Sequence, residues 1–133
     1  MHRAPLLIVT ALLEVGTAIP LFFVPAVPLA LLLGLGEAAP ETLLISRVTG
    51  AALLAVGVTS WFARKGEPSD AQYGVLIGIL IYDAAAAALL AYAGLGMGLV
   101  GVTLWPAVVI HAALAVWSYL SLRSKPPEVK QAK

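Results

Sequence analysis

The sequence predicts an all-α integral membrane protein, a single four-helix bundle. Hydrophobic residues make up 61% of the 133 positions and charged residues 11%, and the mean hydropathy is +0.97. Such values are far from those of an ordinary soluble domain. Four apolar segments of about 20 residues each are long enough to cross a hydrocarbon core of roughly 30 Å. They cover residues 6–24, 43–63, 73–93 and about 102–122. We therefore expect one domain over residues 1–122 and a disordered cytoplasmic tail over residues 123–133.

The first apolar segment follows His2 and Arg3, as the apolar part of a secretory signal does. Glu14 interrupts the segment, however, and no small-x-small cleavage site follows it in good context. The segment is therefore predicted to be a retained membrane helix.

Residues 25–36 are apolar but too short to cross a membrane, and Pro25, Pro28, Gly34 and Gly36 punctuate them. Segments of this length are typical of re-entrant or interfacial structure. Two interpretations stay open: a short amphipathic helix on the outer surface, or a lid over the outer mouth of a polar site.

Glycines predict where the long helices approach one another. Gly50 and Gly57 are seven residues apart and share one face of their helix, and Gly74 and Gly78 form a GxxxG pair. We expect both pairs to pack within the bundle. A homo-oligomer also remains open, because a four-helix unit has little interior. The glycine-rich stretch 94–101 is predicted to be the turn before the last helix.

The basic residues predict the orientation in the membrane. Seven of them fall on one side of the predicted bundle and none in the loops on the other side, which carry only Glu37 and Glu41. By the positive-inside rule, both termini and the loop 64–72 face the cytoplasm. The seven are Arg3, Arg64, Lys65, Arg123, Lys125, Lys130 and Lys133.

Ionisable side chains inside the apolar segments predict a site. Glu14, Asp83 and His111 each fall near the middle of a different segment, and Arg47 lies about one turn inside the segment 43–63. Exposing these groups to lipid is costly, so they should face one another near the bilayer midplane. Two neighbouring carboxylates are also costly to ionise together unless Arg47 or protonated His111 compensates them.

The surroundings of this cluster favour a lipophilic ligand with one polar end. Tyr82 and Tyr92 offer hydroxyl groups and flat apolar surface among aliphatic residues. A quinone, a lipid or a lipophilic cation fits such a pocket. The predicted ligand- or proton-binding residues are Glu14, Arg47, Asp83, His111, Tyr82 and Tyr92.

Other chemistries find little support in the sequence. The chain has no cysteine, which excludes disulfides, thiol redox chemistry and iron–sulfur clusters. Glu14, Asp83 and His111 offer three metal ligands, but no spacing motif supports a metal site, and none is predicted. No nucleophile–base pair or cofactor motif is visible, so independent catalytic activity is not expected. The net charge of +1 does not indicate a nucleic-acid partner.

The order of features resembles the DoxX-like small four-helix membrane proteins of bacteria. The resemblance is carried by Pro25-Ala-Val-Pro28, then Leu33-Gly34, then Ser46-Arg47-Val-Thr-Gly50. Some of these proteins are linked to quinone-dependent oxidation of sulfur compounds. The resemblance therefore implies a bacterial inner membrane, a quinone-adjacent interior and service as an accessory subunit of a membrane redox complex. No residue here matches a catalytic motif of that family.

A second, local resemblance concerns the first helix. Leu13-Glu14-Val15-Gly16-Thr17 is similar to the first helix of small multidrug resistance exporters, whose membrane glutamate binds protons and lipophilic cations alternately. It implies that Glu14 is a shared proton and substrate site. The aromatic-glycine motif of the third helix in those exporters is missing, because this chain reads Ile81-Tyr82-Asp83-Ala84 there.

Three functions follow from the sequence as hypotheses. The first is a protein that binds a lipophilic small molecule, or an accessory subunit of a membrane redox complex. The second is a proton-coupled small-molecule transporter that uses Glu14. The third is a structural or assembly subunit, in which the buried charges hold the helices in register.

Overall fold

The computed structural model describes residues 3–65 and 68–123, and this part of the chain is helical, with no strand. Four of its helices are long and apolar enough to cross a membrane, which confirms the predicted all-α class and its four candidate spans. The disordered tail was predicted for residues 123–133; Arg123 ends the last helix, and residues 124–133 lie outside the described residues. The helices are α1 (Arg3–Phe23), α2 (Ala26–Leu33), α3 (Pro40–Ala63), α4 (Asp70–Leu95) and α5 (Leu104–Arg123).

Local signals in the sequence explain where several helices begin and end. Ser69 precedes α4, and its hydroxyl accepts a hydrogen bond from the backbone N–H of Gln72 (3.3 Å), as an N-cap residue does. Pro40 begins α3 at a position where no backbone N–H is needed. Gly34 ends α2 in the left-handed conformation (φ 73°), which suits glycine because it has no Cβ.

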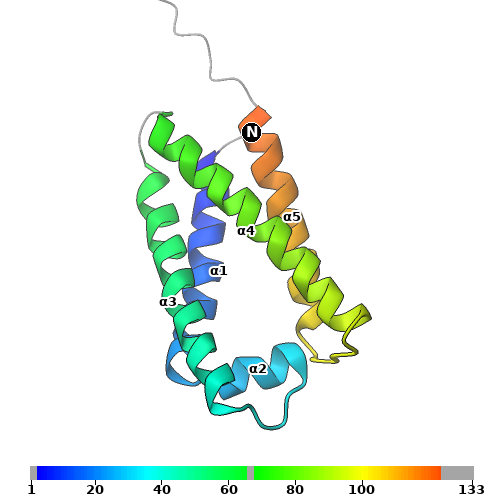
Figure 1. Cartoon of the computed structure of the whole chain (residues 1–133). Helices are drawn as coiled ribbons and strands as arrows, with labels where there is room; N and C mark the ends of the chain where they lie inside the picture. The colour runs from blue at the N-terminus through cyan, green and yellow to red at the C-terminus, as the bar shows by residue number, and fades with distance from the viewer. Residues whose placement is uncertain (1–2, 66–67, 124–133) are drawn as a thin grey trace, which may run out of the picture.

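The long helices form two pairs, α1 with α3 and α4 with α5, and the pairs contact each other less than their members do (Figure 1). Glycines allow the first pair to approach closely, as predicted. A Cβ at Gly50 would lie 2.8 Å from the amide nitrogen of Phe22, and one at Gly57 would lie 3.1 Å from that of Val15. Only glycine fits at these two positions without a shift of α1.

The second glycine pair does not pack as predicted. A Cβ at Gly74 or Gly78 would meet nothing within 4 Å. The expectation that this pair packs within the bundle is therefore wrong for the described part of the chain. The physical reason is that α4 packs mainly on α5, and Gly78 instead borders a cavity between α3 and α4.

The short helix α2 lies across one end of the bundle (Figure 1). The backbone N–H of Thr103 donates to the carbonyl oxygen of Leu31 (3.0 Å). A Cβ at Gly101 would lie 2.2 Å from the carbonyl carbon of Leu32, so the turn before α5 rests directly on the α2 backbone. Residues 25–36 are thus largely a short helix, and it is attached to the second helix pair.

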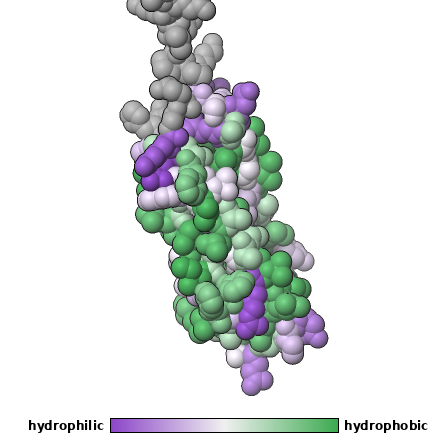
Figure 2. Space-filling view, turned by 90° about the vertical axis from the view of Figure 1, so that its left-hand side faces the viewer, coloured by the Kyte–Doolittle hydropathy of each residue, from purple (hydrophilic) through white to green (hydrophobic). Residues whose placement is uncertain are grey.

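The opposite end of the bundle carries four of the five basic residues that the structure describes, all except Arg47. The start of α1, the end of α3 and the end of α5 meet there (Figure 1), and they carry Arg3, Arg64, Lys65 and Arg123. Between the ends, the face seen in Figure 2 is mainly hydrophobic. Large apolar side chains such as Leu44, at 62% exposure, point outward. This surface suits contact with a lipid bilayer.

Candidate functional site

Three of the predicted site residues come together from three helices. Glu14 on α1, Asp83 on α4 and His111 on α5 each offer a ligand atom, and these atoms lie within 4.8 Å of one another. Glu14 is 2% exposed and Asp83 is fully buried, whereas the His111 side chain is 17% exposed. The structure therefore holds two buried carboxyl groups around one accessible imidazole.

Asp83 and His111 form the best-defined interaction of the site. The Nδ1 atom of His111 lies 2.7 Å from Oδ1 of Asp83, a distance typical of an N–H group that donates to a carboxylate. The ring of Tyr82 meets the imidazole edge-on, with centroids 5.5 Å apart and planes at 86°. Asp83 and Tyr82 together fix the orientation of the imidazole.

Each of the two carboxyl groups has one oxygen that the surrounding protein does not satisfy. Among the described residues, Glu14 Oε2 and Asp83 Oδ2 are buried and have no hydrogen-bond partner. The hydroxyl of Thr10, one turn before Glu14 on α1, is also buried without a hydrogen-bond partner among the described residues. Burying polar atoms without a partner costs about 1–3 kcal/mol each and more for a charged group. The arrangement is therefore poorly explained by stability alone.

A cavity of about 110 Å³ lies beside the cluster. Its polar lining comes from Glu14, His111, Tyr82 and Thr17. Because the lining belongs to α1, α4 and α5, the cavity lies at the junction of the two helix pairs. Its remaining walls are apolar: Leu13, Ala107, Ile110 and Leu114.

Sequence reasoning missed these apolar walls, although a signal was present. Residues 107, 110, 111 and 114 follow the i, i+3, i+4, i+7 spacing that places side chains on one helix face. His111 lies within that pattern. The face of α5 that carries His111 could therefore have been identified as one wall of the site.

Arg47 is not part of the cluster. Its side chain is exposed, and its Nε atom donates to the carbonyl oxygen of Phe22 (3.2 Å). Arg47 lies about one turn before Gly50, where α3 is in close contact with the last turn of α1. It therefore reaches a carbonyl group that is left free at the end of that helix. It does not compensate Glu14 or Asp83.

Tyr92 also lies away from the cluster. It is nine residues after Asp83 on the same helix, which corresponds to about 13 Å along the axis, and it is 63% exposed. Its ring covers Gly96 at the end of α4. Of the two predicted tyrosines, only Tyr82 borders the site.

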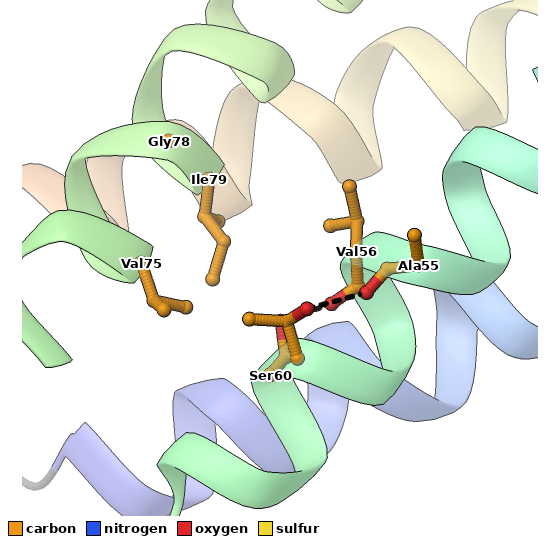
Figure 3. A pocket seen from close by; sticks show the side chains of 7 residues that line it. Ala55, Val56, Ser60, Val75, Gly78 and Ile79 are labelled. Atoms are coloured by element: carbon orange, nitrogen blue, oxygen red, sulfur yellow. Dashed lines mark hydrogen bonds between the residues drawn. The ribbon is translucent and has the colours of Figure 1, made fainter. Parts of the chain in front are cut away.

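In the described part of the chain, two larger cavities lie between α3 and α4. The lining of the one of about 400 Å³ includes Lys65, Ser69 and Gln72 but no carboxyl group or histidine. Figure 3 shows the other, of about 290 Å³, bordered by Val56 and Ser60 of α3 and by Val75 and Ile79 of α4. The Ser60 hydroxyl donates to the carbonyl oxygen of Val56 (2.8 Å). No ionisable side chain lines this cavity, so it offers space for apolar groups only.

The fold and the site together define a class: a multi-pass helical membrane protein with a buried carboxylate–histidine cluster beside a small cavity. Comparison with protein-family models, curated proteins and solved structures finds no match. The two resemblances seen in the sequence therefore stay expectations, and function is argued from the geometry.

Proposed function

We propose that this protein binds a small, mostly apolar molecule of the bilayer, whose polar end enters the site formed by Glu14, Asp83 and His111. The observation that carries the proposal is the pair of buried carboxyl oxygens without a partner, on Glu14 and Asp83. Glu14 itself lines a cavity with apolar walls. These oxygens accept hydrogen bonds, so the ligand's polar end should donate them. A quinol, a hydroxylated lipid and a lipophilic ammonium compound share this property.

The size and position of the cavity indicate how such a ligand is held. A volume of about 110 Å³ accommodates a small polar head but not a long chain. Leu13 and Ile110 line the cavity and are 38% and 42% exposed, so they also contribute to the outer apolar surface. The apolar remainder of the ligand then extends between α1 and α5 toward the lipid. A quinol ligand suits an accessory subunit of a membrane redox complex.

The proposal includes the predicted orientation, with both termini cytoplasmic in the bacterial inner membrane. Its support is that Arg3, Arg64, Lys65 and Arg123 share one end of the bundle, in line with the positive-inside rule. Because the chain has no cysteine, single cysteines report sidedness cleanly. In intact spheroplasts, an impermeant maleimide should label Glu37→Cys and leave Ser69→Cys unlabelled. The reverse pattern would refute the orientation.

Proton-coupled transport through Glu14 is a second candidate, favoured by one specific observation. Glu14 belongs to the pair α1 and α3, whereas Asp83 and His111 belong to the pair α4 and α5, and these pairs contact each other sparingly. Gain or loss of a proton at Glu14 changes the attraction between the pairs. Such a change is a basis for relative movement of two bundles. A purely structural network is less well supported, because it should leave fewer buried oxygens unpaired.

Native mass spectrometry of protein gently extracted from its own membranes tests the binding proposal. We expect one small molecule per chain in the wild type, lost in Glu14→Gln and in Asp83→Asn. Glu41→Gln is the matched control, since Glu41 lies in the first turn of α3 and is exposed. A bare wild-type protein, or the same adduct in all variants, would contradict the proposal. A separate measurement tests transport: the identified molecule is added to proteoliposomes and proton release is followed. Proton release by the wild type that is absent in Glu14→Gln would favour proton-coupled transport.

A further inference from the structure

The cluster has the composition and geometry of a metal site. We propose that Glu14, Asp83 and His111 bind one divalent transition-metal ion, with a coordination position open to the adjacent cavity. The ligand atoms come from three helices and lie within 4.8 Å of one another. The inference goes beyond the proposed lipophilic ligand and does not rest on it, because it concerns the metal ion alone.

The charges of the site favour a dication. Two buried carboxyl groups face one imidazole, which supplies at most one positive charge. In the part of the chain that the structure describes, the arginines are engaged elsewhere: Arg3 with Gln72, Arg47 with Phe22, Arg64 with Trp61 and Arg123 with Tyr119. A divalent ion balances both carboxylates while His111 stays neutral, the state in which imidazole binds metals.

The unpartnered atoms are the second, independent observation. Glu14 Oε2 and Asp83 Oδ2 are buried, and neither has a hydrogen-bond partner among the described residues. Oxygen and nitrogen ligands lie about 2.0–2.2 Å from an ion such as Zn²⁺, so ligands around one ion are separated by up to about 4 Å. The ligand atoms of Glu14, Asp83 and His111 lie within 4.8 Å of one another. Small side-chain rotations, which the long Glu14 side chain allows, would bring them to the separation that one ion requires.

The ligand types narrow the choice of metal. One imidazole and two carboxylates suit Zn²⁺, Mn²⁺, Fe²⁺ or Co²⁺, whereas Cu⁺ prefers sulfur ligands, and Mg²⁺ and Ca²⁺ prefer oxygen ligands throughout. Three protein ligands leave at least one position for another molecule, as in catalytic zinc sites. Thr17 and Tyr82 add hydroxyl groups to the lining of the adjacent cavity.

Cobalt is the probe for a direct test. Purified protein in nanodiscs is treated with a chelator, dialysed and titrated with Co²⁺, and binding is followed by visible ligand-field absorption. We expect one Co²⁺ per chain, displaced by Zn²⁺, with affinity falling at acidic pH because protons compete for the ligands. Glu14→Gln, Asp83→Asn and His111→Gln should each weaken binding about tenfold or more, in the range of altered metal sites. Glu41→Gln and His2→Ala should stay within about twofold of the wild type.

A measurement on the wild type alone keeps the test decisive if a variant fails to fold. With Mn²⁺ bound, pulsed electron paramagnetic resonance should detect coupling to an imidazole nitrogen. Absence of that coupling, binding without fixed stoichiometry, or unchanged affinity in a folded His111→Gln would each overturn the metal site. None of these outcomes affects the adduct seen in native mass spectrometry, so failure of the metal site and failure of the lipophilic ligand are distinguishable.

Discussion

Replacement of Glu14 by glutamine should leave the ligand-free, metal-free protein as stable as the wild type or more stable. Glu14 and Asp83 offer oxygens within 4.8 Å, and His111 is already bonded to Asp83. Two like unit charges at that separation repel by about 3.5 kcal/mol at an effective dielectric constant of about 20. Glutamine keeps the shape of the side chain and removes this repulsion. We therefore expect a gain between zero and about 3 kcal/mol in the free energy of unfolding.

Equilibrium unfolding in mixed micelles, driven by increasing dodecyl sulfate and followed by tryptophan fluorescence, measures this change. Three tryptophans report on the transition. Glu41→Gln removes the same charge at an exposed position and should change stability by no more than about 0.5 kcal/mol. The chelated wild type is the reference, because a bound ion would stabilise it by mass action.

The opposite result would refute the reasoning. If the cluster is a structural network, removal of one member leaves a buried charge without compensation and costs about 3–5 kcal/mol. A loss of this size in Glu14→Gln, with Glu41→Gln unchanged, would show that Glu14 holds the bundle together. The functional proposals would then lose their main support.

Three further predictions follow from particular contacts. Asp83→Asn removes the same repulsion as Glu14→Gln but also weakens the 2.7 Å bond to His111, so it should be less stable than Glu14→Gln by about 1.5–3 kcal/mol in the same unfolding assay; equal stability of the two variants would contradict the bond. Gly50→Ala should lower the free energy of unfolding by about 1–3 kcal/mol, because its Cβ would lie 2.8 Å from the Phe22 amide nitrogen. Gly78→Ala should be neutral or stabilising, since a Cβ there meets nothing within 4 Å. Equal effects of the two substitutions would refute the close packing at Gly50. Arg47→Gln should leave Co²⁺ affinity within about twofold, since Arg47 is bonded to Phe22; a tenfold loss in the cobalt titration would place it in the site.

Much of the fold could be predicted because membrane-spanning helices can be recognised from the length and apolar composition of their segments. The segments 43–63 and 73–93 fall within α3 and α4, and their observed ends differ by only a few residues. The close approach at Gly50 and Gly57 was also predictable. The role of Gly74 and Gly78 was not, because a GxxxG spacing shows that a helix surface is flat but not which neighbour uses it.

The site could be predicted in outline for a different reason. Each of Glu14, Asp83 and His111 lies near the middle of its helix, so depth alone brings them to one level of the bundle. Which faces turn inward depends on the packing of all four helices. Arg47 illustrates this. It lies about two turns from the start of α3, and with α3 packed against the last turn of α1 at Gly50 its side chain bonds to Phe22 at the end of α1 and not to the cluster.

The division into two helix pairs explains why a costly cluster can persist. Glu14 stands on α1, which is fixed to α3 by the backbone contacts at Gly50 and Gly57. Asp83 and His111 are joined to each other across α4 and α5. Each pair is therefore held together by contacts of its own, and the polar groups lie where the pairs meet. A site at such a junction need not satisfy its own oxygens, because the surrounding packing holds them in place until a ligand or an ion supplies the missing partner.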